Sequence, residues 1–247
     1  MRARVSPETM SRDPKPKIGV SGCLLGEAVR YDGTDKRDDL ICSGLSSRFE
    51  LIPVCPEVGA GLGVPRPPVR LVGDPGHILA LGLEDPGLDV TRALESFSRA
   101  WLCQSRGICG FILKSRSPSC GLRDTPVFDK TGHIRAEGPG IFAGMLMAHD
   151  GLLPVEDETG IRDPARGGSF LARVEIYNAW QHLCAADVTP RRLAAFHQRQ
   201  ARLLARLSPR DRRKIGDLLA RAGEKPAMEV AECYMEQIMS ALKKPRT

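Results

Sequence analysis

The chain has 247 residues, of which 42% are hydrophobic, so it can bury a substantial core. Its formal net charge is +6. No apolar run is long enough to span a bilayer, and residues 1–16 form a polar leader that lacks the apolar centre of a signal peptide and is predicted to be disordered. Eight cysteines without a secretion signal favour free thiols or metal ligands over disulfides, and we expect a reducing, cytoplasmic location and no membrane contact.

Three of the cysteines share one setting, because each follows a short apolar run that is typical of a buried strand in a parallel sheet. They are Cys23 after residues 17–20, Cys55 after residues 49–54 and Cys120 after residues 111–114. Parallel strands end at one edge of their sheet, so the three thiols are expected to converge there. Three thiolates can hold an iron–sulfur cluster by three irons and leave the fourth iron open to an outside ligand. The alternative for each cysteine alone is a buried thiol that packs as a small hydrophobic residue.

The segments after the first two cysteines contain candidate charged groups. The loop after the first holds Arg30 and Asp32, which would add a charge and a proton-transfer group. In the sequence Cys55-Pro-Glu57, the stiff proline places a possible acid or base within two residues of the thiol. Residues 59–68 are too rich in glycine and proline for a helix, and they are predicted to form a loop of the site. They lack the strand and helix context of a dinucleotide-binding turn.

The third cysteine lies in a run of eight residues, 114–121, that also contains cations and hydroxyl groups. Hydroxyls such as those of Ser115 and Ser117 can bond the sulfurs of a cluster or orient a substrate carbonyl. Lys114 or Arg116 would offset the negative charge of three thiolates. The alternative interpretation of this run is a plain serine-rich turn.

Cys103 and Cys109 lie six residues apart and could pair or act as ligands, but core packing is favoured for them. Cys42, Cys184 and Cys233 lack a comparable setting. No His-x-x-x-His or Cys-x-x-Cys spacing occurs in the sequence, so a conventional zinc site has little support.

Short apolar runs alternate with helical patterns as far as about residue 153, which predicts an α/β fold with a Rossmann-like, mainly parallel sheet and helices on both faces. The later elements expected in this region are helices at residues 88–103 and 139–148 and a strand at residues 152–155. Residues 157–168 have turn chemistry without periodicity and are predicted to be a linker. A small all-helical domain is expected at residues 169–247.

This helical region carries the basic charge of the protein. It contains fifteen lysines and arginines and eight acidic residues, a balance of +7, whereas the preceding residues carry −1. Helices are expected to start at Thr189-Pro190, at Ser208-Pro209 and near Pro226, the last one running to Leu242. The charge indicates an acidic polymer such as RNA or DNA as a partner, or else a solvated helical surface.

The motifs around the three cysteines resemble those of the 2-thiouracil desulfidase family over residues 17–163. The motifs that carry this resemblance are residues 21–26 (SGCLLG), 30–33 (RYDG), 55–57 (CPE), 65–68 (PRPP), 114–121 (KSRSPSCG) and 140–143 (GIFA). The resemblance implies a [4Fe-4S] cluster on Cys23, Cys55 and Cys120, whose free iron takes sulfur from a thiolated pyrimidine while water replaces it at the ring carbon. It also implies acid/base and hydrogen-bonding roles for Glu57 and for Ser117 or Ser115, with Asp32 a lesser candidate.

The region after residue 169 separately resembles a helical domain found behind such desulfidases. Proteins with both parts look like tRNA desulfidases that act on 4-thiouridine, so this resemblance implies tRNA as a partner, bound through the basic helices. Members of the helical family continue past the position of residues 243–247, so the resemblance implies a shortened domain. Free 2-thiouracil and 4-thiouracil stay open as substrates. A competing hypothesis is a non-catalytic redox sensor that carries a cluster or zinc and binds RNA through its tail.

Overall fold

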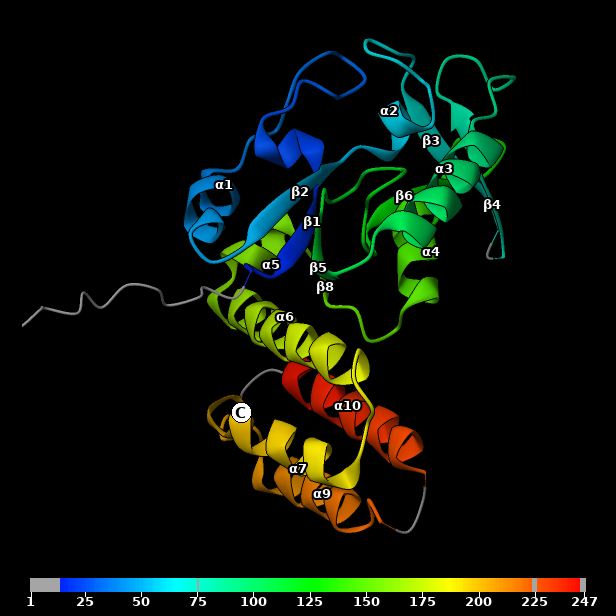
Figure 1. Ribbon diagram of the computed structural model, residues 1–247. Coiled ribbons are helices and arrows are strands. Elements are labelled where there is room, and N and C mark those ends of the chain that lie inside the picture. The colour runs from blue at the N-terminus through cyan, green and yellow to red at the C-terminus, as the bar shows by residue number, and fades with distance from the viewer. Residues whose placement is uncertain (1–13, 75, 224–225, 245–247) are drawn as a thin grey trace, which may run out of the picture.

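The computed structural model of the protein describes residues 14–74, 76–223 and 226–244 (Figure 1). Most of the leader predicted to be disordered lies outside these residues. A four-stranded parallel sheet forms the centre of the upper part of the molecule, in the order β2-β1-β5-β8. Its strands are β1 (Lys17–Ser21), β2 (Glu50–Val54), β5 (Ile108–Leu113) and β8 (Val155–Asp157). The three strands that precede the cysteines are therefore neighbours, as the sequence predicts.

Helices cover both faces of this sheet, which confirms the predicted layers. All six residues of β5 are buried, and from Phe111 to Leu113 they alternate between the two faces. Phe111 and Leu113 pack with side chains of α3 (Thr91–Gln104) and α4 (Ile141–His149). On the other face, Ile112 joins a cluster with side chains of the helices α1, α5 and α6. These helices are α1 (Asp39–Ser46), α5 (Glu158–Arg162) and α6 (Pro164–Cys184).

A second four-stranded sheet lies beside the first and has no counterpart in the sequence prediction. Its strands, in the order β4-β3-β6-β7, are β3 (Val69–Asp74), β4 (His77–Gly82), β6 (Thr125–Phe128) and β7 (Ile134–Gly138). Two antiparallel hairpins are joined through the parallel pair β3 and β6. The strands are only partly buried, and β3, β6 and β7 lack the continuous apolar runs by which the central strands are recognised. The strand β4 does contain such a run, at residues 78–81, which the sequence prediction missed.

The predicted linker at residues 157–168 is wrong, because this segment folds as the end of β8, the short helix α5 and the first turn of α6. Its turn-forming residues cap these helices. The Asp157 side chain accepts a bond from the backbone N–H of Gly160, and the Asp163 side chain accepts bonds at the start of α6, where Pro164 takes the first helical position. Ser169, the predicted start of the helical domain, lies inside α6.

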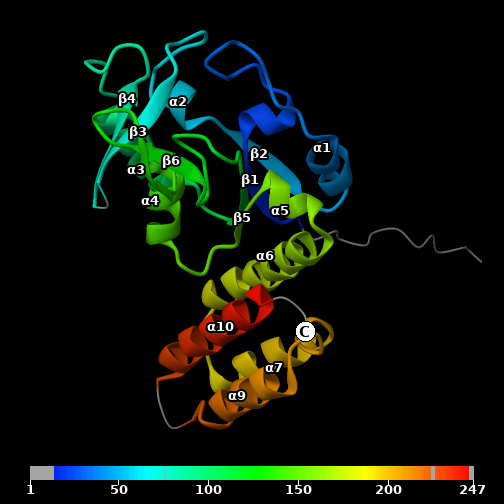
Figure 2. The same ribbon diagram turned by 180° about the vertical axis from the view of Figure 1, so that it is seen from behind.

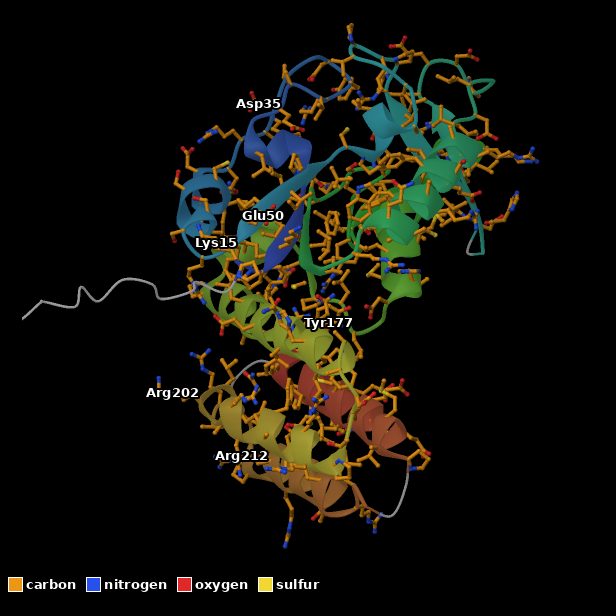
Figure 3. The ribbon with its side chains drawn as sticks, in the orientation of Figure 1. Lys15, Asp35, Glu50, Tyr177, Arg202 and Arg212 are labelled. Atoms are coloured by element: carbon orange, nitrogen blue, oxygen red, sulfur yellow. The ribbon has the colours of Figure 1, made fainter. Side chains whose placement is uncertain are left out.

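The remaining chain forms a helical bundle below α6 (Figures 1 and 2). It consists of α7 (Pro190–Arg199), α8 (Ala201–Leu204), α9 (Pro209–Ala220) and α10 (Ala227–Lys243). The predicted caps are confirmed, since the hydroxyls of Thr189 and Ser208 each accept a backbone N–H bond at the start of α7 and α9. Arg202 and Arg212 extend from this bundle into solvent, whereas Tyr177 of α6 lies on the side of the sheet (Figure 3).

One hydrophobic cluster connects the sheet, α6 and the bundle without a break. Phe170 and Val174 of α6 pack with Ile112 of β5, and Tyr234 of α10 belongs to the same cluster. A Cβ atom on Gly110 would come within 2.6 Å of Val174, so a glycine at this position lets α6 approach the sheet. None of the described helices has the length and apolar content that a membrane crossing requires.

Candidate functional site

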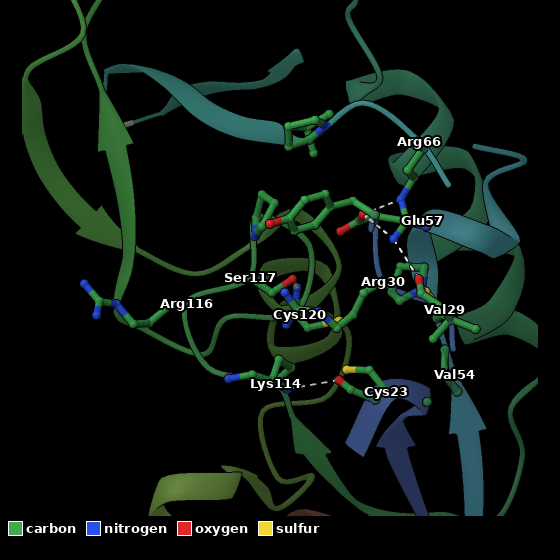
Figure 4. Close-up of a pocket in the computed structure, with 18 of the residues that line it drawn as sticks. Cys23, Val29, Arg30, Val54, Glu57, Arg66, Lys114, Arg116, Ser117 and Cys120 are labelled. Carbon is green, nitrogen blue, oxygen red and sulfur yellow. Dashed lines mark hydrogen bonds and ion pairs between the residues drawn. The ribbon is translucent and has the colours of Figure 1, made fainter. Parts of the chain in front are cut away.

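The three predicted cysteines line one pocket at the carboxyl edge of the parallel sheet (Figure 4). Cys23 lies in a 3-10 helix, η1 (Gly22–Leu25), that directly follows β1, and Cys55 precedes α2 (Pro56–Gly59) at the end of β2. Cys120 comes from the longer loop after β5. The pocket has a volume of about 220 Å³, which suits a small molecule but not a folded RNA.

All three thiols are free, and burial raises their pKa values. The pKa of Cys23 rises to about 11, first through burial and then through the nearby Cys55. Burial also raises the pKa of Cys120, and Cys23 and Cys55 raise it further. The Cys55 thiolate therefore opposes the ionisation of Cys23, and both oppose that of Cys120. A metal centre that binds them as thiolates would remove this cost.

The loop that carries Cys120 is fixed from inside by Ser117. The Ser117 hydroxyl accepts bonds from the backbone N–H groups of Ser119 at 3.3 Å and Cys120 at 3.1 Å. The Thr125 hydroxyl donates to the Ser117 carbonyl at 3.1 Å. Ser117 also lines the pocket, so its own hydroxyl hydrogen is available to a ligand.

Glu57 is held in the pocket wall by two partners (Figure 4). Its Oε2 accepts a hydrogen bond from Nε of Arg66 at 2.8 Å and forms an ion pair with the same guanidinium, 2.7 Å from Nη2. Its Oε1 accepts one bond from the buried Ser119 hydroxyl at 2.9 Å. The side chains of Glu57 and Arg66 are only 13% and 5% exposed, so this ion pair is largely shielded from water.

A second ion pair supports the opposite side of the pocket. Lys114 donates to Glu158, and the backbone N–H and hydroxyl of Ser115 donate to the same carboxylate at 2.8 and 2.7 Å. Burial raises the pKa of Glu158, but the hydrogen bonds from Lys114 and Ser115 lower it by more, so it lies below its ordinary value. The hydroxyl of Ser115 is therefore committed to this network, although the residue lines the pocket.

Asp32 is the one predicted site residue that does not line the pocket described by the structure. Its carboxylate accepts bonds from the N–H and hydroxyl of Thr34 at 3.1 and 2.7 Å, and weaker ones from Arg30 at 3.4 Å. The hydrogen bonds from Thr34 hold the pKa of Asp32 well below its usual range. Asp32 therefore shapes the turn that follows Arg30.

The donor set of the pocket fits an iron–sulfur cluster. Within the described residues, no three His, Cys, Asp or Glu side chains surround a single-ion site. A cluster is larger than one ion, so its ligands lie around a wider centre. The pocket supplies three soft sulfur donors, and four cations offset the charge of their thiolates: Arg30, Arg66, Lys114 and Arg116.

The chain matches the model of the 2-thiouracil desulfurase family over residues 18–158, more than half of its length. The protein belongs to this family. It is 32% identical over 110 residues to the uncharacterized protein YbbK of Bacillus subtilis (strain 168), a match that covers 42% of this chain and 72% of YbbK. A solved structure described as the [4Fe-4S]-dependent thiouracil desulfidase TudS is similar with a TM-score of 0.48 and 33% identity, covering 63% of this chain and 99% of the other.

Sequence reasoning assigned no role to three residues that build the site: Arg66, Ser119 and Glu158. Arg66 and Ser119 lie inside motifs that were recognised for their prolines and their cysteine. Glu158 directly follows β8, the fourth strand of the parallel sheet. The rule that sites gather at the carboxyl ends of parallel strands would have found it, had residues 157–168 not been interpreted as a linker.

Proposed function

We propose that this protein is a desulfidase that holds a [4Fe-4S] cluster on Cys23, Cys55 and Cys120 and converts thiolated uracil to uracil. The observation that carries the proposal is the meeting of three free thiols from three neighbouring strand ends in one pocket of a 2-thiouracil desulfurase family member. When bound, such a cluster supplies an open iron that acts as a Lewis acid for a soft sulfur leaving group. The net reaction is hydrolysis: water adds oxygen to the ring carbon, the C–S bond breaks, and sulfide and uracil are released.

Glu57 is our candidate for proton transfer. Its Oε2 is occupied by Arg66, whereas Oε1 accepts a single bond, from Ser119, and keeps a lone pair. We assign to Oε1 the proton that leaves the attacking water or reaches the pyrimidine ring. Ser119 is then a positioning residue, because it fixes the direction in which this oxygen faces.

Of the two candidate serines, Ser117 is the better partner for the substrate. Its oxygen accepts two backbone bonds, which leaves its hydrogen free to donate to a substrate oxygen or sulfur. Ser115 donates its hydrogen to Glu158 instead and holds Lys114 in place. Asp32, which is tied to Thr34, has a structural role in its turn.

The basic bundle supports a finer proposal, that the thiolated uracil is 4-thiouridine in tRNA. The cations expected to contact phosphates are all exposed: Arg191, Arg192, Arg199, Arg202, Arg206, Arg212, Arg213 and Lys214. The helices α7 and α9 that carry most of them lie side by side (Figures 1 and 2). A pocket of about 220 Å³ would admit one base at a time, so the RNA would present its thiolated base to the pocket out of the stack.

The test is to purify the protein without oxygen, measure iron, acid-labile sulfide and visible absorption, and assay 2-thiouracil, 4-thiouracil and thiolated tRNA. A brown protein that releases sulfide and uracil from a thiolated base is the expected result. An intact cluster without turnover of any of the three substrates would overturn the proposal in favour of the redox sensor. Turnover of the free bases but not of tRNA would overturn only the finer proposal.

A further inference from the structure

Tyr31 stands out among the residues around the pocket. It is the only aromatic side chain among the described residues that line it. Large aromatic side chains are mostly buried, yet Tyr31 is 43% exposed. A single exposed tyrosine elsewhere on a protein surface would need no explanation, but the exposed Tyr31 ring lies at the pocket that contains the three thiols. A ring face in this place is available to a planar ligand.

Hydrogen bonds around the turn hold Tyr31 in this position. The Tyr31 carbonyl accepts the backbone N–H of Arg66 at 2.9 Å, which ties the turn to the pocket wall. The turn closes through the bond from the Gly33 N–H to the Arg30 carbonyl at 3.0 Å, and Gly33 has a φ of 75°, a conformation that favours glycine. Asp32 bonds both Thr34 and Arg30, so it stiffens the same turn.

Arg30 restricts the ring further. Its guanidinium carbon lies 5.5 Å from the centre of the Tyr31 ring, within the range of a cation–π interaction. Arg30 also lines the pocket and is close enough to lower the pKa of Cys23 (Figure 4). The pair therefore joins an aromatic surface to a cation at the place where a ligand would meet the thiols. A restrained aromatic ring loses little entropy when it binds a ligand.

We propose that Tyr31 and Arg30 form a stacking platform that binds the heteroaromatic ring of the substrate. This inference rests on the proposed function and adds a rule of substrate selection to it. Planar, unsaturated thiopyrimidines gain stacking energy on the platform, and saturated analogues that carry the same thiocarbonyl group do not. Stacking tolerates differences in ring substituents, so the platform accepts both 2-thio and 4-thio bases.

The test compares 2-thiouracil with 5,6-dihydro-2-thiouracil, which keeps the thiocarbonyl but loses the flat π-system, in the wild type, Tyr31→Leu and Tyr31→Phe. Tyr31→Leu should raise the KM for 2-thiouracil about 5- to 150-fold, the usual loss when a stacking side chain is removed. It should reduce the preference for 2-thiouracil over the dihydro compound by a similar factor, with iron content and visible absorption unchanged. Tyr31→Phe keeps the ring and should recover most of the loss.

The matched control is Leu83→Ala, which removes an apolar side chain of similar exposure, 48%, that does not line the pocket. It should leave the KM for 2-thiouracil and the preference for 2-thiouracil over the dihydro compound unchanged. Equal KM values and equal preferences in the wild type and Tyr31→Leu would overturn the platform. If the wild type turned over neither compound, the proposed function would fail, but titration calorimetry with 2-thiouracil would still test the platform. Weaker binding by Tyr31→Leu than by the wild type would support the platform. Equal binding by the two proteins, or no binding by the wild type, would overturn it.

Discussion

The pocket and the helical bundle use charge in opposite ways. In the pocket, Arg66 and Lys114 are largely shielded from water, and each is paired with one carboxylate, Glu57 and Glu158. On the bundle, the cations of α7, α8 and α9 are exposed to solvent. Buried charges act at short range on one position and are little affected by salt, whereas exposed charges attract over a distance and are screened. Chemistry in the pocket and polymer binding on the bundle are therefore expected to respond to different perturbations.

The largest effect is expected from the cysteines. Replacing Cys23, Cys55 or Cys120 singly with alanine should abolish both the visible absorption of the cluster and the release of sulfide, because each removes one of three ligands. Absorption spectra, iron content and sulfide release measure this. Cys109→Ala is the matched control, since this thiol is also buried and lies on β5, the strand that precedes Cys120.

Cys109→Ala and the exposed Cys103→Ala should both keep the cluster. If Cys120→Ala retained its full absorption, Cys120 would not be a ligand. The prediction that three strand ends supply the ligands of one cluster would then be wrong.

The second prediction separates chemistry from cluster binding at Glu57. Glu57→Gln keeps the shape but loses the proton-transfer group, so kcat should fall by about 10² to 10⁴ while iron content stays constant. Arg66 would lose the partner of a buried charge, so thermal unfolding should be followed in the same samples. Ser119→Ala, which removes only the bond to Oε1, should lower kcat less and leave Arg66 paired. Loss of iron in Glu57→Gln would instead make Glu57 a residue of the cluster site.

The sequence predicts the central sheet and its cysteines well, because fully buried strands have continuous apolar runs and their carboxyl ends share one edge. It predicts Glu57 and Ser117 as neighbours of the thiols for the same reason, since both follow directly in those segments. Half-exposed strands of the second sheet such as β7 were missed because they carry no strong apolar signal. The pairing of Arg66 with Glu57 depends on how the intervening loop folds back, and that of Glu158 with Lys114 depends on tertiary packing between distant segments; neither is encoded by spacing along the chain.

The third prediction concerns Glu158, which links the pocket to the segment leading into α6. Glu158→Gln should lower the free energy of unfolding by about 3 kcal/mol, because it leaves Lys114 without its counter-ion in a largely buried place. Denaturation with urea measures this. The pKa of folded Glu158 lies below its ordinary value of 4.5, so its ionic contribution is full above that value and is lost as the pH falls through the lower folded pKa.

The stability difference between the wild type and Glu158→Gln should therefore be constant near neutral pH and shrink in acid below about pH 4.5. Glu84→Gln, on the exposed turn after β4, should show no such difference. A difference for Glu158→Gln that stayed the same down to about pH 3 would show that the ion pair with Lys114 does not stabilise the fold.

Deleting the bundle is a poor test of its function. A cut at Ser169 would divide α6 and expose the apolar cluster in which Phe170 and Val174 cover β5. The truncated protein is expected to lose stability and to fail on free thiobases as well as on tRNA. Substitution of exposed cations avoids this problem, because side chains on the surface contribute little to folding.

The smallest effect is expected when Arg212 and Arg213 on α9 are both replaced with alanine, because this change removes only two of the exposed cations of the bundle. Binding of tRNA should weaken, and the slope of log affinity against log salt should become shallower by about 0.7 to 0.9 for each phosphate that the protein no longer neutralises. Turnover of free 2-thiouracil should stay constant, because both side chains lie outside the pocket. Arg92→Ala with Arg99→Ala on α3 removes the same charge from the α/β region and should leave the slope as it is. Equal changes of slope in the two double variants would assign the effect to net charge and would remove the distinction between a catalytic pocket and an RNA-binding bundle.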